Sequence, residues 1–427
     1  MHVCDFHPLI IGGDLGVYAL ARAFHEAYGC TSTVISGAEL GPIKDSCILE
    51  VHSLGMGASC DDLSREALRI APELKERYAC KDLILLTNSD SQVRSVVKMK
   101  SQLEEYYLVP FVDQDLLDKL MNKDSFAELC EIYGVSTPAS LTIQASDFAQ
   151  LNFEDIKDKL PGGFPLIAKP ANSGLYERMR FEGMKKVYKL NNKEELMQLL
   201  SRLGQAGVQS PFIIQELIPG DDLYMRSITA YVDQNAKVRM FSSAQVLLEE
   251  HTPSALGNPA AMITRPYPEL YKQAQTLLEA CSYKGFANFD VKLDPRTNKA
   301  YFLEINPRIG RNNYYTTAAG LNPVRYLVDD IVYHKYDKDD SSVDSSDKTV
   351  LYSVLTPHLV KRYVDQELKR EINQLSLSGN LVHPLIYAAD KGGGIKSLRR
   401  RFYILANKLN HYRKFKRYYP KRSADGL

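Results

Sequence analysis

Three side chains with oxygen donors, Asp290, Glu304 and Asn306, have the types and spacing that could bind a divalent cation. They lie in the stretch 286–311, FANFDVKLDPRTNKAYFLEINPRIGR, where apolar and polar residues alternate as in a β-strand. A polar turn at 294–299 divides this stretch into two strands that would pair as a hairpin. The turn sets Asp290 directly across from Glu304.

The alternation also predicts which side chains share the polar face. In the second strand Phe302, Glu304 and Asn306 should share one face, with Asp290 opposite. Facing residues of an antiparallel pair have Cβ atoms about 5 Å apart, so two carboxylates there repel unless a cation, a shared proton or solvent intervenes. Mg²⁺ takes such oxygen ligands together with nucleotide phosphates. The alternative is an ordinary hydrated polar face.

Four basic residues could supply positive charge near these carboxylates. Lys169 ends an apolar strand at 164–170, where an ammonium group can meet phosphate oxygens, and Lys123 begins a helix. Arg308 and Arg311 follow the hairpin, and a guanidinium can hold a carboxylate or phosphate in a fork. For the lysine at 123 the alternative is a solvated helix-start charge, and for each arginine it is a structural salt bridge.

A further strand at 211–218, PFIIQELI, ends in a sharp turn at 219–222. With a nucleotide in the cleft, Gln215 or Glu216 could meet the adenine amino group, and Asp222 could meet the ribose hydroxyls. Acidic residues after such a turn are commonly only turn formers, which is the alternative here.

The elements that must position these residues fall into three segments. We expect an α/β domain over 1–115, in which buried strands alternate with helices. The segment 116–335 would carry the site, and the family resemblance described below implies a lid subdomain within it at about 138–217. The last segment, 336–427, begins with a polar stretch at 336–348 that has too few apolar groups to pack, and it ends in a basic tail.

Composition indicates a soluble protein of more than one domain, with 427 residues, 44% of them hydrophobic and 25% charged. The net charge of +1 hides an asymmetry, because from Lys391 onward 12 lysines and arginines face the single acidic residue Asp425. No apolar run is long enough for a membrane span and no secretory signal is visible, so we expect a cytoplasmic protein. Seven scattered cysteines fit reduced thiols.

The run Glu304-Ile305-Asn306-Pro307-Arg308 resembles the metal-binding signature of the ATP-grasp ligases, in which an Asp, a later Glu and an Asn hold magnesium on ATP. Within that superfamily the chain is similar, nearly end to end, to the D-aspartate ligases of peptidoglycan cross-bridge synthesis. The resemblance implies an α+β / α/β ATP-grasp fold with an N-terminal Rossmann-like pre-ATP-grasp domain and a C-terminal basic helical extension. The similar motifs are 17–22, 122–123, 169–173, 218–222, 285–290 and the basic C-terminus.

The resemblance also implies a reaction. ATP would phosphorylate the β-carboxylate of D-aspartate, and the side-chain amine of the diamino acid in a muropeptide precursor would then attack. Lys123 and Lys169 would hold phosphate, while Arg308 and Arg311 would stabilise the acyl phosphate or grip the α-carboxylate. No residue is identified as a base for the amine, and His251 is a candidate only by its place in a loop.

Two features depart from the wider superfamily. The loop 171–183 lacks the usual glycine-rich phosphate cradle, so Arg178, Arg180 or Lys185 would have to replace backbone amides. Asn288 stands where many relatives carry an arginine that meets the acyl phosphate. These departures concern the lid rather than the metal site.

Two other functions remain open: a ligase for another amino acid or dipeptide, and a scaffold that binds nucleotide without catalysis. The intact Asp290, Glu304 and Asn306 set argues against a degenerate scaffold, and a tail with few stacking positions argues against nucleic acid as a partner. The basic, aromatic tail suits a helix lying on an anionic membrane at the inner face. Alternatively, the tail packs on the acidic body or binds the pyrophosphate of the precursor.

Overall fold

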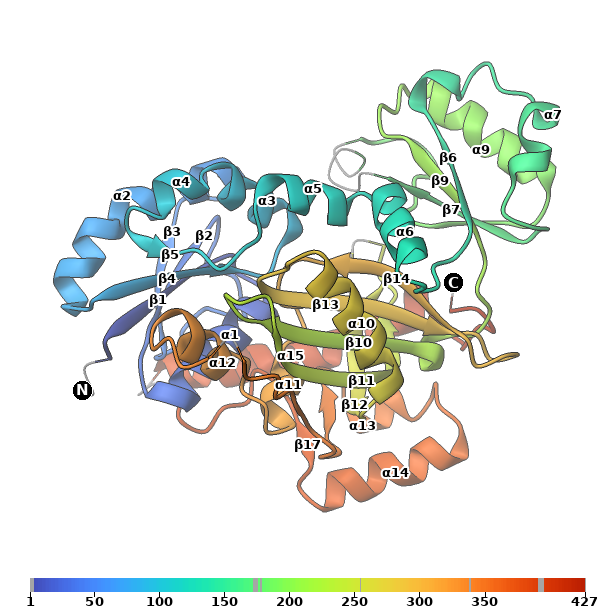
Figure 1. Ribbon diagram of the computed structural model, residues 1–427. Helices are drawn as coiled ribbons and strands as arrows, with labels where there is room; N and C mark the ends of the chain where they lie inside the picture. The colour runs from blue at the N-terminus through green and yellow to red at the C-terminus, as the bar shows by residue number, and fades with distance from the viewer. Residues whose placement is uncertain are drawn as a thin grey trace.

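The computed structural model describes residues 4–171, 176, 179–253, 255–337, 339–390 and 395–426. These residues form three sheets, shown in Figure 1, where the small four-stranded sheet stands apart from the two larger layers. Arg178, one of the expected phosphate-binding residues of the lid loop, lies outside the described residues.

The first sheet is parallel, as the predicted Rossmann-like domain requires, with strand order β3-β2-β1-β4-β5. The strands β1, β2 and β4 are buried, as expected for a parallel sheet covered by helices, whereas the edge strand β3 is only partly buried. The elements are β1 Phe6–Ile11, α1 Leu15–Tyr28, β2 Ser32–Ser36, β3 Leu49–Ser53, α2 Cys60–Tyr78, β4 Asp82–Thr87, α3 Asp90–Lys98, α4 Lys100–Leu103, β5 Tyr107–Leu108 and α5 Gln114–Met121.

The carboxyl ends of β1 and β4 meet at one edge of this sheet, which is where ligands bind in open parallel sheets. Asp14 caps α1 by accepting hydrogen bonds from the backbone N–H groups of Gly16 and Val17, and its carboxylate also accepts from Asn88 Nδ2 at 2.9 Å. A Cβ at Gly16 would lie 2.9 Å from the backbone of Arg311, so this turn packs directly against the residues that follow the hairpin.

The small sheet corresponds to the predicted lid subdomain and has the order β6-β9-β7-β8, all antiparallel. It has an apolar core of its own, in which leucines of one helix pack on the sheet. Its elements, with the helix that leads to it, are α6 Lys123–Ile132, β6 Ser140–Ile143, the 3-10 turn Ala145–Asp147, α7 Phe153–Ile156, the 3-10 turn Lys157–Lys159, β7 Leu166–Pro170, β8 Tyr188–Leu190, α9 Lys193–Gln205 and β9 Phe212–Glu216.

The central sheet has the order β14-β13-β10-β11-β12-β16-β17, with β15 paired to β11. Sequence reasoning missed β12, and the last strands come from residues beyond 335. The elements are the 3-10 turn Asp222–Tyr224, β10 Met225–Val232, β11 Val238–Glu250, β12 Asn258–Thr264, α10 Pro268–Ala280, β13 Gly285–Leu293, β14 Ala300–Asn306, α11 Tyr314–Ala318, α12 Pro323–Ile331, β15 Asp344–Ser345, β16 Leu351–Ser353, α13 Pro357–Val360, α14 Gln366–Leu377, β17 Leu381–Val382 and α15 Ile395–Tyr418.

One prediction about the hairpin is wrong. Phe302 does not share the face of Glu304, because the register of the pair shifts between them: Asp290 faces Glu304, but Val291 faces Phe302. This β-bulge leaves Leu303 without a directly facing partner and turns the phenyl ring into the core, where it meets Phe289 edge to face at 5.6 Å. The bulge therefore keeps the apolar and acidic side chains on opposite faces.

The polar stretch 336–348 is not a free linker. Arg239, only 1% exposed, ion-pairs with Asp233 at 2.6 Å and donates to the backbone carbonyls of Asp337 and Asp340. The strand β15 within this stretch pairs with β11. The expectation that the stretch cannot pack considered only apolar contacts, and here polar contacts hold it on the sheet.

The C-terminal segment packs on the first helix of the chain. Tyr18 donates to Asp390 at 2.8 Å across 372 positions, and Arg22 donates to the carbonyls of Pro384 and Ile386. Arg400 of α15 ion-pairs with the same Asp390 at 2.9 Å. The predicted helical extension is confirmed, and one side of it is integral to the core. None of the helices in the described part of the chain is both long and apolar enough to cross a membrane.

Candidate active site

The hairpin carboxylates occupy the position predicted for them. Asp290 and Glu304 are directly paired in register, and Asn306 Nδ2 donates to Asp290 Oδ2 at 3.3 Å. All three line one cavity of about 150 Å³. The structure thus brings together the three oxygen-bearing residues that the sequence predicted as metal ligands.

The two carboxylates do not carry the same charge without a cation. Burial and the nearby Glu304 raise the pKa of Asp290 to about 8. Burial acts in the same direction on Glu304, but Lys123 and Lys169 overcome it and lower the pKa of that carboxyl. At neutral pH the pair therefore holds one proton and one negative charge, as expected for two acids too close to ionise together.

The predicted lysines come from two different elements and meet beside Glu304. Lys123 begins α6, and Lys169 lies in β7 of the lid sheet. Burial and the charge of Lys123 lower the pKa of Lys169 to about 7, and burial is also the main cause of the lowered pKa of Lys123. Two adjacent desolvated ammonium groups favour an anion with several oxygens, such as a polyphosphate.

Arg308 and Arg311 both line the cavity, and each is paired to the N-terminal sheet. Arg308 makes a two-point ion pair with Asp90 at 2.6 and 3.1 Å. Arg311 Nε lies 3.3 Å from Asp14 Oδ2, and its Nη2 lies 4.0 Å from Glu250 Oε1. Both arginines therefore form the salt bridges of the alternative interpretation, and both residues also line the cavity.

The cavity has further walls that sequence reasoning did not assign. Its described lining adds Asp90, Lys186, Gly257, Asn258, Pro259, Asn288, Gly310 and Asn312 to the predicted residues. Asp90 opens a helix directly after a buried strand, a pattern that could have marked it as a pocket residue. Lys186 lines the cavity, whereas the predicted Lys185 next to it is not in the lining. The Nζ of Lys186 donates to the carbonyl of Leu256 at 3.1 Å.

Two of the residues predicted to contact the nucleotide, Glu216 and Asp222, form hydrogen bonds within the protein. Glu216 Oε1 accepts from the backbone N–H of Ala139 at 2.9 Å, and Gln215 is half-buried beside it in β9. Asp222 is buried and accepts from the N–H of Glu249 at 2.9 Å, and its Oδ2 lies 3.0 Å from His251 Nε2. A ribose contact by Asp222 remains a prediction.

His251, the candidate base, contacts other side chains of the protein. Its ring stacks on Tyr419 with the ring centroids 3.6 Å apart, and its Nε2 lies 3.0 Å from Asp222 Oδ2. Next to it, burial together with the charges of Asp222 and Asp290 raises the pKa of Glu249 to about 8. The region therefore contains one more acid that is neutral at pH 7.

The residues fit a divalent cation that is shared with a polyanion. The donors present are two facing carboxylates and the amide oxygen of Asn306, which are hard ligands suited to Mg²⁺. Among the described residues no group of three or more His, Cys, Asp or Glu side chains could hold a metal by itself. A cation held by Asp290, Glu304 and Asn306 would take its remaining oxygens from water or from a bound phosphate.

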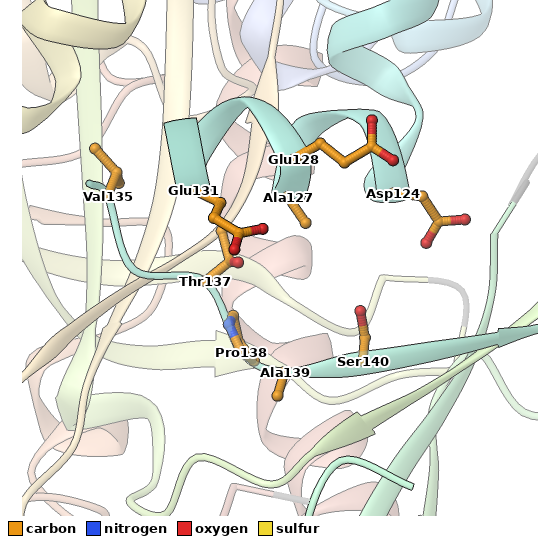
Figure 2. Close-up of a pocket in the computed structure, with 9 residues that line it drawn as sticks. All are labelled: Asp124, Ala127, Glu128, Glu131, Val135, Thr137, Pro138, Ala139 and Ser140. Carbon is orange, nitrogen blue, oxygen red and sulfur yellow. The ribbon is translucent and has the colours of Figure 1, made fainter. Parts of the chain in front are cut away.

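A second hollow, of about 520 Å³, lies between α6 and the segment that enters the lid (Figure 2). Asp124, Glu128 and Glu131 project from the helix, and Glu131 points toward Thr137. None of the predicted site residues is in its lining, which is acidic and unsuited to phosphate. The site is the smaller cavity at the hairpin.

Comparison with known proteins agrees with a site for phosphate and a divalent cation. Residues 229–325 match the family model described as carbamoyl-phosphate synthase L chain, ATP binding domain. The chain is 33% identical over 415 residues to a D-aspartate ligase of Enterococcus faecium (strain Aus0004), covering 96% of this chain and 97% of the relative.

Solved structures share the fold at low identity. An L-amino acid ligase from Bacillus licheniformis has a TM-score of 0.52 at 14% identity, covering 78% of this chain and 77% of its own. The Hydrogenobacter thermophilus biotin carboxylase domain, in complex with MgADP, ADP and bicarbonate, scores 0.56 at 14% identity, covering 78% and 71%. N5-carboxyaminoimidazole synthetase from Staphylococcus aureus scores 0.54 at 17% identity, covering 86% of each chain.

Proposed function

From the premise that this chain belongs to the D-aspartate ligase family of ATP-grasp enzymes, and so forms a carbon–nitrogen bond between a carboxylate and an amine, we propose the substrates and the chemistry. ATP phosphorylates the β-carboxylate of D-aspartate, and the side-chain amine of the diamino acid in a peptidoglycan precursor attacks the product. The observation that carries this proposal is the facing pair Asp290 and Glu304 beside Lys123 and Lys169. That arrangement is suited to moving a phosphoryl group.

The first step is phosphoryl transfer. A carboxylate oxygen of the amino acid attacks the γ-phosphorus, the bond from phosphorus to the bridging oxygen breaks, and ADP leaves. The protein contributes position and charge to such a transfer. Asp290, Glu304 and Asn306 would hold Mg²⁺, which would neutralise charge on the phosphates when bound. Lys169 and Lys123 would regain full charge against the phosphate oxygens.

The second step forms the amide. The amine nitrogen attacks the acyl carbon, the carbon–oxygen bond to phosphate breaks, and inorganic phosphate and a proton are released. Arg308 lies beside the metal ligands and would stabilise the acyl phosphate, while Arg311 would grip the α-carboxylate in a fork. Gln215 and Glu216 would meet adenine, and Asp222 would meet ribose.

We propose that the enzyme works in the cytoplasm and touches the anionic inner face of the membrane, where cell-wall precursors are consumed. The nine basic residues and no acidic residue within 395–418 support this location. No nucleic acid partner is proposed.

A substrate panel tests the assignment. Phosphate release should require ATP, Mg²⁺ and an amino acid, and it should be at least about tenfold faster with D-aspartate than with L-aspartate, D-alanine or D-glutamate when muropeptide is the acceptor. Preference for a different acid or for a free amino acid as acceptor would establish the dipeptide or other amino acid ligase instead. Nucleotide binding with no turnover on any pair would establish the non-catalytic scaffold.

A further inference from the structure

The helix α15 has two apolar sides, and only one of them is covered by the protein. The inner side packs on the core through Arg400, His411 and Phe415, all at most 5% exposed. Tyr403 and Tyr412 also lie against the core. The inner side of the helix therefore packs on the acidic body, which was one of the alternatives for the basic tail. Arg400 pairs with Asp390, and the Lys414 ammonium group lies 3.5 Å from Glu250.

The outer side carries a continuous row of large apolar residues at alternating intervals of three and four positions. That spacing keeps side chains on one face of a helix. The exposed fractions are 63% for Ile395, 63% for Leu398, 72% for Phe402, 57% for Leu405 and 59% for Leu409. We name these five residues the outer row.

The charges beside the outer row have one sign. Arg399 and Arg401 flank the row, and Arg413, Lys416 and Arg417 continue past its end, all on exposed positions. No acidic residue occurs anywhere within 395–418. A partner for this face must therefore accept apolar groups and carry negative charge.

We propose that the outer row docks on a lipid bilayer that contains anionic headgroups. The apolar side chains enter the boundary between headgroups and acyl chains, and the flanking guanidinium and ammonium groups bind the phosphates. A second copy of the chain fits poorly, because two outer rows face to face would bring like charges together without an acid to pair them. Nucleic acid fits poorly too, because phosphates would leave the apolar row in water.

This surface rests on the proposed function only for its location at the membrane and not for the ligase chemistry. The inner side holds α15 to the body, so the outer row is presented as a preformed face and needs no folding on contact. The helix has 24 residues and is about 36 Å long, and the outer row covers about 21 Å of that length.

The test is flotation of the full chain with vesicles of phosphatidylcholine alone or with about one-third phosphatidylglycerol. We expect binding to the anionic vesicles that weakens as salt is raised. The double variant Phe402→Asn with Leu405→Asn should lower the partition coefficient about tenfold or more. Arg399→Gln with Arg401→Gln should lower it about tenfold or more on anionic vesicles.

Matched controls make the same chemical changes elsewhere. Met56→Asn with Leu377→Asn replaces two residues that are each 89% exposed, and Lys157→Gln with Lys193→Gln removes two exposed charges from the lid. Both controls should bind as the unaltered protein does, within about twofold. The proposal would be overturned if binding did not depend on lipid charge, or if the outer-row variants and the controls lost vesicle binding equally.

Two further readings separate the alternatives. If the protein self-associates without lipid and Phe402→Asn with Leu405→Asn disperses it, the row is an interface between copies and the bilayer proposal fails. All outer-row variants should keep phosphate release with soluble substrates, and Glu304→Gln should keep vesicle binding. If the unaltered protein releases phosphate but does not bind anionic vesicles, the docking surface alone is rejected. If the unaltered protein binds the vesicles but turns over no substrate pair, the ligase assignment alone is rejected.

Discussion

The Arg308 guanidinium is held in a two-point ion pair by Asp90, a residue 218 positions earlier in the chain, with Nε–Oδ1 at 2.6 Å and Nη2–Oδ2 at 3.1 Å. The same guanidinium donates to Asn306 Oδ1 at 3.1 Å. Burial opposes its charge, but Asp90 more than compensates and raises the pKa of Arg308. The first turn of α3 therefore orients an arginine that touches a proposed metal ligand.

The first prediction concerns this contact. Asp90→Asn should lower kcat about 10–100-fold, because groups that orient metal-site residues typically matter by that factor, and it should change KM for ATP much less. The matched control is Asp115→Asn, an exposed acid in the first turn of α5. Steady-state kinetics with melting curves would check this. A normal kcat, or a drop in kcat explained entirely by a lower Tm, would show that Asp90 only holds the domains together.

The second prediction separates function from stability. Glu304→Gln should lower ATP turnover by at least about hundredfold, because a charged ligand is lost. The nucleotide-free variant should stay folded but melt at a lower temperature than the unaltered protein, because the amide no longer offsets the charges of Lys123 and Lys169 beside it. Glu269→Gln, at an 80% exposed side chain, is the control. Near-normal turnover in the folded variant would exclude this metal site.

The third prediction concerns proton uptake at Lys169. Its pKa of about 7 leaves it mostly neutral at pH 8, and phosphate oxygens should raise that pKa, so binding ATP without Mg²⁺ should take up protons at pH 8. Calorimetry in two buffers with different ionisation enthalpies measures the uptake. Lys169→Met should lose most of it and bind ATP more weakly, and Lys169→Arg should not restore normal turnover. Equal uptake in all three proteins would place the titrating group elsewhere.

The fourth prediction is a pH dependence of stability. His7 is 2% exposed, its Nε2 lies 2.8 Å from Thr33 Oγ1, and its ring stacks on Tyr78 at 3.6 Å. Burial lowers the pKa of His7 to about 4 from its usual 6.5. Between these values the unfolded chain binds the extra proton, so acidification from pH 6.5 to 4 should remove about 3 kcal/mol of unfolding free energy.

Urea unfolding at several pH values checks this. In His7→Gln the slope of unfolding free energy against pH in that window should be shallower than in the unaltered protein. The control is His358→Gln, which alters an exposed histidine and should keep the original slope. Parallel slopes in all three proteins would contradict the assignment.

The pairing of Asp290 with Glu304 could be predicted because strand periodicity and turn length are local properties. The bulge at Leu303 could not, since it breaks the periodicity on which the prediction depended. The strand β12, Asn258–Thr264, was missed because the proline at position 259 resembles a loop signal. A proline is tolerated here because it lies at the start of the strand.

Contacts between distant segments set the other limit. Nothing local marks Asp90 as the partner of Arg308 or Asp14 as the partner of Arg311, because each pair joins the N-terminal sheet to the end of the hairpin. Likewise, the composition of the tail predicted a basic helix but not which of its sides packs inward. That choice depends on Asp390 and Glu250, which lie in other parts of the fold.

The bonds from α1 to the segment around Asp390 have a consequence for how the protein is made. Tyr18 and Arg22 leave the ribosome early, but their partners are about 370 residues behind them. At about 5–20 residues per second, synthesis leaves that side of the first helix uncovered for about 20–70 s. The nascent N-terminal domain therefore exposes the face of α1 that carries Tyr18 and Arg22 until the C-terminal segment is made. A chaperone that binds such surfaces should be found on chains stalled before residue 390.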